Sequence, residues 1–206
     1  MPRAPVEILQ TYRRDQILGA AREVIGENGY ERSSVDQIAK RAGLSRSTVY
    51  EYFSSKEDIL RSSFSAHRDQ LSQDLMRRVG EASGLEAQLT AFLEICLSRV
   101  DQNRAFFLSI AVPLPLDEAA ASEGPGGTEF AAMIKDFNDV VNRILDEACE
   151  RGELDAPIDP VDRNSLGTLI VGAMSARGRL DSPPAAADSA AHLARFALRG
   201  LGHAGR

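Results

Sequence analysis

A short polar segment in the first third of the chain concentrates groups that could contact another molecule. Residues 46–53 read RSTVYEYF, so about two helical turns carry one arginine, two hydroxyl side chains and two tyrosines. Arginine can reach the edge of guanine in a DNA groove, while hydroxyl and basic groups hold phosphates. A corner that only supports a fold has no need to gather these groups. The segment is therefore a candidate nucleic-acid contact.

The residues before this segment predict the elements that would position it. A helix over 33–42 is expected to begin at Ser33, with Asp36 three residues later as in a capping box. Its apolar residues recur at three- and four-residue steps and so share one face: Val35, Ile38, Ala39 and Ala42. Gly43 stands where a helix end favours a left-handed residue, and Ser45 can cap the next helix. Helix, turn and polar second helix make a helix-turn-helix, whose second helix lies in the DNA major groove.

Two longer helices are predicted on either side of this pair. The first covers about 12–28 after a short, poorly ordered arm, and its apolar stripe consists of Ile17, Ala20, Ala21, Val24 and Ile25. The other covers about 56–79 and bridges from the polar pair into the rest of the chain. His67 falls on the apolar stripe of this bridge, where a packed histidine is more common than a sensor.

A longer set of residues resembles the N-terminal domain of TetR-family transcriptional regulators. The resemblance covers roughly the first 60 residues without a gap. The residues that carry it are Ile17-Leu18-x-Ala20-Ala21, Gly29-Tyr30, Ser33-Ser34-Val35-x-x-Ile38-Ala39, Ala42-Gly43-Leu44-Ser45, Thr48-Val49-Tyr50-x-Tyr52-Phe53-x-Ser55-Lys56-Glu57-x-x-Leu60. It implies an all-α chain with a three-helix DNA-binding domain over 1–55 and a helical ligand-binding and dimerisation domain over 56–206.

The resemblance also implies roles for particular side chains. Thr48, Tyr50 and Lys56 would clamp the DNA backbone, and Ser34 would lie against a phosphate. Arg46 and Ser47 are the candidates to reach base edges, Arg46 at guanine O6 and N7. Ser45 and Tyr52 complete the predicted DNA-binding set, whereas Phe53 is expected to lie in the core.

Charge is distributed unevenly along the chain. Its net charge is −6, yet residues 1–61 hold 10 Lys and Arg against 9 Asp and Glu, whereas residues 62–206 hold 14 against 21. Only the first part can approach phosphates without strong repulsion. No apolar run approaches the roughly 18 residues that a membrane span needs. The two cysteines, Cys96 and Cys149, form no metal-ligand or disulfide framework, so we expect a cytoplasmic protein with no metal and no cofactor.

The remainder of the chain predicts five more helices and no strand, nine helices in all. They cover about 85–101, 103–112, 128–151, 160–180 and 185–201, with an acidic, turn-forming segment over 117–127. The last two helices are rich in small residues and apolar over much of their circumference. Such helices need cover on both sides, so we expect a homodimer through 160–201. A dimer would read two half-sites of a palindromic operator.

The resemblance further implies an effector pocket in the second domain, and release of DNA when the effector binds. Candidate lining residues are Phe92, Cys96, Phe106, Phe107, Ile110, Met133, Phe137 and Met174. Aromatic and methionine side chains suit a lipophilic or aromatic effector. For any one of these residues, a place in the ordinary core is the commoner reading.

Three other functions are compatible with parts of the sequence. An enzyme is disfavoured because the chain contains no nucleophile elbow, Walker loop, dinucleotide fingerprint or HExxH motif. A thiol redox switch would use Cys96 and Cys149, but cysteines on apolar helical stripes usually lie in the core. An activator, or a regulator that needs its ligand to bind DNA, would have the same fold, so the sequence leaves this choice open.

Overall fold

The computed structural model describes residues 5–106, 127–154 and 158–201. All regular structure in these ranges is helical. The helices are α1 (Pro5–Asn28), α2 (Val35–Ala42), α3 (Arg46–Tyr52), α4 (Lys56–Glu81), α5 (Leu85–Gln102), α8 (Gly127–Glu150), α9 (Pro160–Arg179) and α10 (Ala186–Gly200). A further helical segment begins at 104–106. The predicted all-α class is confirmed. No helix within the described ranges is long and apolar enough to cross a membrane.

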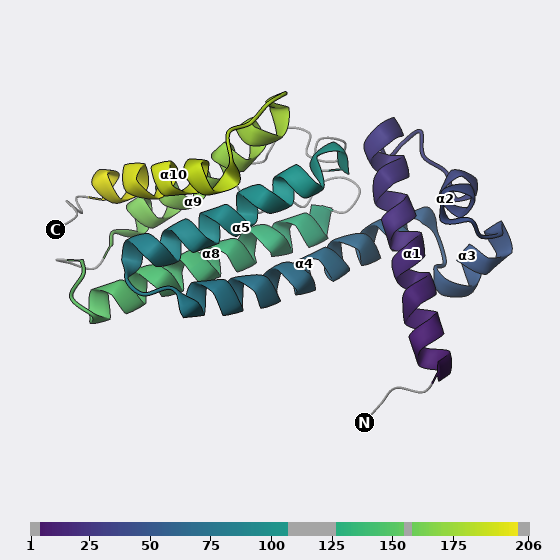
Figure 1. Cartoon of the computed structure of the whole chain (residues 1–206), viewed down its shortest axis with the longest axis horizontal. Helices are drawn as coiled ribbons and strands as arrows, with labels where there is room; N and C mark the ends of the chain where they lie inside the picture. The colour runs from purple at the N-terminus through teal and green to yellow at the C-terminus, as the bar shows by residue number, and fades with distance from the viewer. Residues whose placement is uncertain (1–4, 107–126, 155–157, 202–206) are drawn as a thin grey trace.

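The described helices form two separate apolar cores, and α4 contributes residues to both. The head, defined here as α1–α3 with the first part of α4, buries Ile17, Ile25, Ile38, Val49, Ile59 and Leu60. The bundle, formed by the rest of α4 with α5, α8, α9 and α10, buries a second set that includes Leu71, Leu89, Phe92, Ile144 and Ala194. Figure 1 shows the head at one end of α4 and the bundle helices running alongside the remainder.

The predicted helix-turn-helix is confirmed in its main parts. Gly43 ends α2 in the left-handed conformation with φ 65°, which glycine adopts at no steric cost. The Ser45 hydroxyl caps α3 by accepting a hydrogen bond from the backbone N–H of Thr48 at 3.0 Å. The buried face of α2 is the predicted one. The polar segment is therefore a short helix fixed at its beginning and backed by the head core.

The start of α2 differs from the prediction by one residue. Ser34 is the N-cap, and its capping box is completed by Gln37 instead of by Asp36. The Ser34 N–H donates to Gln37 Oε1 at 2.8 Å, while the Gln37 N–H donates to Ser34 Oγ at 3.3 Å. Ser33 turns inward and donates to the carbonyl oxygen of Gly29 at 2.7 Å. The Ser33 hydroxyl also lies 3.3 Å from the carbonyl oxygen of Val24, so Ser33 is bound to the end of α1 and the turn after it, and Ser34 takes the cap position.

The first helix is longer than predicted, because α1 begins at Pro5 and not near Tyr12. Proline favours the first position of a helix, since its missing N–H would have no intrahelical partner there. Most of the other predicted bounds agree with the structure to within one or two residues. Most of the predicted helix 103–112 and nearly all of the acidic segment 117–127 lie outside the described residues.

Candidate nucleic-acid interface and effector core

Five of the eight side chains predicted to bind DNA lie on α3, and three of these are exposed. Arg46, Ser47 and Tyr50 are exposed, whereas Thr48 and Tyr52 are half-buried. Val49 and Phe53, on the opposite side of the segment, are buried in the head core. Helix α3 is therefore amphipathic. Its arginine, hydroxyl and phenol groups lie on the outer side, and its apolar side chains pack in the head core.

Arg46 is held at the surface by two neighbours. One of its guanidinium nitrogens lies 3.0 Å from Asp36 Oδ2, and the guanidinium carbon lies 5.5 Å from the centre of the Tyr50 ring. Both members of the ion pair are more than half exposed, so the pair is worth little in energy. Arg46 can exchange Asp36 for another acceptor at small cost, as a base-reading residue must.

Hydroxyl groups at the start of α3 form a local cluster. Ser45 Oγ lies 2.8 Å from both Ser47 Oγ and Thr48 Oγ1, in addition to its bond from the Thr48 N–H. The Ser34 hydroxyl at the start of α2 is engaged with Gln37. Ser34 and Ser45 therefore first serve as helix caps, and they orient the beginnings of the two helices.

Lys56 does not extend away from the head. Its Nζ donates to the carbonyl oxygen of Tyr30 at 2.9 Å and to that of Ser33 at 3.0 Å, and it lies 4.1 Å from the centre of the Tyr30 ring. The structure thus brings Lys56 to the turn between α1 and α2, whereas the other predicted residues lie on α3 or at the start of α2.

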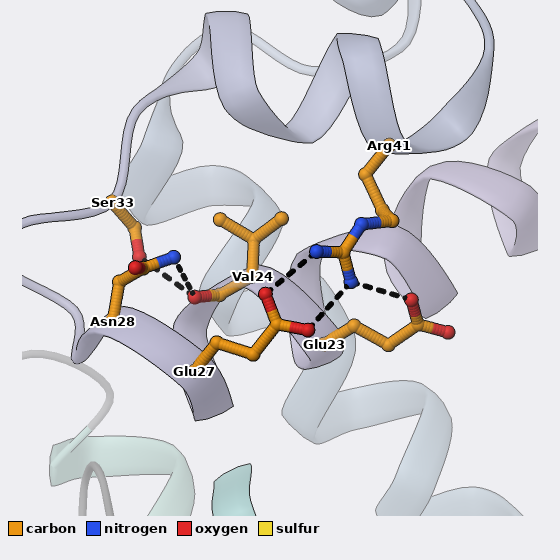
Figure 2. A network of polar contacts seen from close by, with 6 residues as sticks. All are labelled: Glu23, Val24, Glu27, Asn28, Ser33 and Arg41. Atoms are coloured by element: carbon orange, nitrogen blue, oxygen red, sulfur yellow. Dashed lines mark hydrogen bonds and ion pairs between the residues drawn. The ribbon is translucent and has the colours of Figure 1, made fainter.

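The contacts that fix α2 on α1 include side chains that the sequence interpretation did not single out (Figure 2). Arg41 donates to Glu23 Oε2 at 2.9 Å and to both carboxylate oxygens of Glu27, at 3.0 and 2.6 Å. The hydrogen bond from Arg41 lowers the pKa of Glu27. Two glutamates four residues apart lie on one face of a helix, and that spacing could have indicated a shared basic partner.

The same region holds a second missed contact. Asn28 Nδ2 donates to the carbonyl oxygen of Val24 at 2.9 Å, and the buried Ser33 hydroxyl lies 3.3 Å from the same oxygen (Figure 2). Near the other end of α2, Gln16 Nε2 donates to the carbonyl oxygen of Ala42 at 2.6 Å. Helix α2 is therefore bound to α1 near both of its ends. These contacts fix the position of α2, the helix that precedes α3.

Seven of the eight predicted effector-lining residues fall into three groups. Phe92, Cys96, Met133 and Phe137 are buried together in the bundle core, and the rings of Phe92 and Phe137 meet edge to face with centroids 5.9 Å apart. Met174 is partly buried at the margin of that core. Phe107 and Ile110 lie outside the described residues.

Phe106 does not join the other lining residues. It is buried in the head core, with its ring centroid 5.5 Å from that of Phe64. Gly26 of α1 permits this approach, since a Cβ atom there would meet Ala105 Cβ at 2.9 Å. The chain after α5 therefore returns to the head, so Phe106 supports the head instead of lining a pocket in the bundle.

Arg177 and Cys96 of the bundle are both buried, with different consequences. The buried guanidinium of Arg177 makes two 2.7 Å hydrogen bonds to the Asp101 carboxylate and also donates to the carbonyl oxygen of Pro184 at 2.8 Å. It ties α9 to the end of α5 and to the segment before α10. Burial raises the pKa of the Cys96 thiol, which disfavours the thiolate that redox chemistry requires.

Comparison with known proteins agrees with this architecture. Residues 17–62 match the family described as "Bacterial regulatory proteins, tetR family". The "Fatty acid metabolism regulator protein" of Bacillus subtilis (strain 168) is 32% identical over 146 residues, which cover 70% of this chain and 72% of that protein. The "HTH-type transcriptional activator FasR" of Mycolicibacterium smegmatis is 29% identical over 208 residues, covering 93% and 84%.

Solved structures show the same fold over nearly the whole chain. The regulator FadR from Bacillus subtilis, determined in complex with stearoyl-CoA, has a TM-score of 0.72 and 26% identity, covering 90% of this chain and 97% of that one. The fatty acid degradation regulator FadR from Bacillus halodurans has a TM-score of 0.74 and 21% identity, covering 99% and 100%. With its helix-turn-helix head, its helical second part and these relatives, the chain belongs to the TetR family of DNA-binding transcriptional regulators.

Proposed function

We propose that this regulator is a homodimeric repressor that binds a palindromic operator and leaves it when a long-chain acyl thioester binds in the bundle. The observation that carries the effector class is the similarity, at 26% identity and a TM-score of 0.72, to a regulator solved with stearoyl-CoA. The 32% identical relative named for fatty acid metabolism supports the same class.

The DNA-binding face in this proposal is centred on α3. Arg46 and Ser47 reach base edges, while Thr48, Tyr50 and Ser34 contact the backbone, with Tyr52 at the margin. The exposure of Arg46, Ser47 and Tyr50, and the weak surface ion pair of Arg46, support these roles. Ser45 contributes by fixing the start of α3.

The dimer in this proposal forms through α9 and α10. Large apolar side chains are exposed on these helices or directly after them: Val161, Leu180 and Phe196. An interface between two copies through these helices would remove such side chains from water. Two copies related by a two-fold axis would present two α3 helices to half-sites about 34–36 Å apart.

The bundle core offers suitable surroundings for an acyl chain. Phe92, Phe137, Met133 and Cys96 pack together as an apolar core between α5 and α8. Methionine can change its side-chain conformation to open space, because its thioether chain is unbranched and flexible. An effector that binds only a rearranged bundle shifts the population of that form and can alter the spacing of the two heads through α4.

A DNA-binding titration with and without the thioester tests this function. The probe is a duplex enriched by the full-length protein from a random-sequence library, and its affinity is measured by fluorescence anisotropy. Stearoyl-CoA is expected to weaken binding, while free coenzyme A at the same concentration serves as the control. Failure to enrich any duplex would contradict sequence-specific binding. Unchanged affinity at stearoyl-CoA concentrations that saturate the protein in calorimetry would contradict the effector.

An activator is the second candidate, because the relative FasR, 29% identical over 93% of this chain, is named a transcriptional activator. A promoter–reporter assay, combined with the same DNA-binding titration, distinguishes a repressor from an activator. Repression predicts higher reporter expression after deletion of the regulator, and activation predicts lower expression. A regulator that needs its ligand would bind the duplex more tightly when stearoyl-CoA is present.

A further inference from the structure

Three grooves on the surface of the bundle differ in the charge of the residues that line them. The groove between α4 and α8 has two arginines and three aspartates in its lining. The described residues that line a groove beside the start of α5 include three glutamates and no lysine or arginine. A third groove, of about 420 Å³ between α4 and α5, has three arginines and two carboxylates: Arg77, Arg78, Arg99, Asp74 and Glu94. This last groove, called here the arginine groove, is therefore net positive.

A positive groove stands out in this part of the chain. Residues 62–206 hold 14 Lys and Arg against 21 Asp and Glu, so an anion is repelled by most of the surface of the bundle. Of the three grooves compared, the arginine groove is the one whose charge favours an anionic ligand.

The three arginines keep hydrogen-bond donors for a ligand. A guanidinium carries five N–H donors. Arg78 donates from one terminal nitrogen to Glu94 at 3.1 Å, and Arg77 and Arg99 each donate from one terminal nitrogen to Asp74. The other guanidinium nitrogens of these three residues make no hydrogen bond within the described part of the chain. Each arginine can therefore bind a phosphate oxygen without first leaving its carboxylate.

The two arginines of α4 are also accessible. The side chain of Arg77 is 61% exposed and that of Arg78 is 42% exposed, whereas that of Arg99 is 19% exposed and forms the inner part of the groove. Ion pairs at such exposure contribute little energy. A phosphate can accept two parallel hydrogen bonds from one guanidinium, so it competes well with the existing partners of Arg77 and Arg78.

The arginine groove lies beside the core that was proposed for the acyl chain. Ile95 lines the groove and also belongs to the bundle core, where it is 8% exposed. The next residue, Cys96, packs in the same core as Phe92 and Phe137. Neighbouring residues of α5 thus face the positive groove on one side and the apolar core on the other. An acyl-coenzyme A has an apolar tail and a flexible arm that ends in phosphates, and it needs both surroundings close together.

We propose that the arginine groove binds the phosphate groups of the coenzyme A part of the effector, with Arg77 and Arg78 as the main contacts and Arg99 behind them. This proposal rests on the function proposed above and adds a site for the charged end of the ligand. The bound phosphates would join α4, the helix that head and bundle share, to α5. They would also distinguish a thioester from a free fatty acid, which has no phosphate.

Calorimetry on the full-length protein tests this site with three probes: stearoyl-CoA, sodium stearate and free coenzyme A. The double variant Arg77→Gln/Arg78→Gln removes both accessible cations. Arg143→Gln is the matched control, because Arg143 is an exposed arginine in the groove between α4 and α8 and makes no ion pair with any described residue. Glu94→Gln removes a carboxylate that competes with phosphate for Arg78.

The double variant should bind stearoyl-CoA more weakly by about tenfold or more, since charged hydrogen bonds are lost. Its affinity for stearate should be unchanged, and Arg143→Gln should bind both ligands as the wild type does. Added salt should weaken the binding of stearoyl-CoA to the wild type more than to the double variant. Glu94→Gln should bind stearoyl-CoA more tightly, a result that loss of stability cannot produce.

Three results would overturn the proposal. The double variant could keep wild-type affinity for stearoyl-CoA, or it could lose affinity for stearate and stearoyl-CoA equally, as a disturbed core would. A loss in Arg143→Gln alone would place the phosphates in the groove between α4 and α8. If the wild type does not bind stearoyl-CoA, the proposed effector fails, and free coenzyme A then tests the groove alone by ligand-observed NMR. Binding that disappears in the double variant would support the groove, while absent or unchanged binding would overturn it.

Discussion

The head and the bundle are both helical and both contain arginine–carboxylate pairs, such as Arg41 with Glu27 in the head, but they differ in how their other polar contacts are distributed. In the head, polar side chains bind backbone groups, as Ser33 and Lys56 do in the turn before α2. In the bundle, arginine–carboxylate pairs join helices that are distant in sequence, such as Arg68 with Asp136 and Arg177 with Asp101. Backbone contacts fix a precise surface, as DNA reading requires. The ion pairs of the bundle instead hold long helices to one another.

Two matched core substitutions, one in the bundle and one in the head, should destabilise the two regions separately. They have the largest expected effect on the free energy of unfolding. Leu89→Ala in the bundle and Ile38→Ala in the head remove fully buried side chains, and each should lower the free energy of unfolding by about 2–5 kcal/mol. Urea denaturation measures the loss, and hydrogen exchange locates it. Among the described helices, α4 is the one that contributes to both cores, so lost protection should concentrate in the substituted region. Equal loss of protection in both regions would show that the cores unfold as one unit.

Arg177 tests how much an ion pair contributes to the bundle. Its side chain is 5% exposed, whereas that of Asp101 is 37% exposed, so the carboxylate can regain some water when the arginine is removed. Arg177→Met should therefore cost about 2–3 kcal/mol, somewhat less than breaking a fully buried pair.

Arg68→Met provides the control for Arg177→Met. The Arg68 side chain is 43% exposed and pairs with a partly exposed Asp136, so its loss should cost no more than about 1 kcal/mol. Thermal or urea denaturation of the two variants gives the comparison. Equal costs would mean that burial of the ion pair does not set its contribution.

His67 lies on α4, the helix that both regions share, and provides a pH test of the junction. Burial, with Arg99 and Arg22 nearby, lowers the pKa of His67 from 6.5 to about 4. The unfolded chain therefore binds a proton at a higher pH than the folded chain does. The stabilisation is fully present above pH 6.5 and is lost as the pH falls from 6.5 towards 4, by up to about 3 kcal/mol.

Urea denaturation at several pH values checks this dependence. His67→Gln should flatten the decline between pH 6.5 and 4, because glutamine has no titrating group. The carboxyl groups of Asp58 and Asp74, whose pKa values are lowered by hydrogen bonds, account for further loss at lower pH in both proteins. An identical pH profile for His67→Gln and wild type would exclude His67 as the cause.

Arg46 tests the outward face of the head, and its effect is expected on DNA binding instead of on stability. Arg46→Ala should weaken binding to the selected duplex by about 1–3 kcal/mol and relax one base position. Asp36→Ala is the control, since it removes the partner of Arg46 and leaves the arginine available for DNA. Competition with duplexes altered at single positions measures the relaxation. An equal loss on random DNA would contradict base reading.

Much of the head could be predicted because its signals are local. The left-handed glycine at 43, the Ser45 cap and the apolar face of α2 depend on residues within a few positions of each other. The displaced capping box shows the limit of such reasoning. Ser33 and Ser34 are equivalent by residue type, and the carbonyl groups of Val24 and Gly29 bind the one that turns inward.

By itself, the amino-acid sequence determined the helices, the helix-turn-helix and the polar character of α3, since periodicity, caps and turn residues act over short distances. Only the tertiary structure decided which partners distant residues find. It placed Lys56 on the turn before α2, Phe106 in the head and Arg177 on Asp101. These contacts join residues 23 to 76 positions apart. The folded path of the chain, which no local pattern encodes, brings them together.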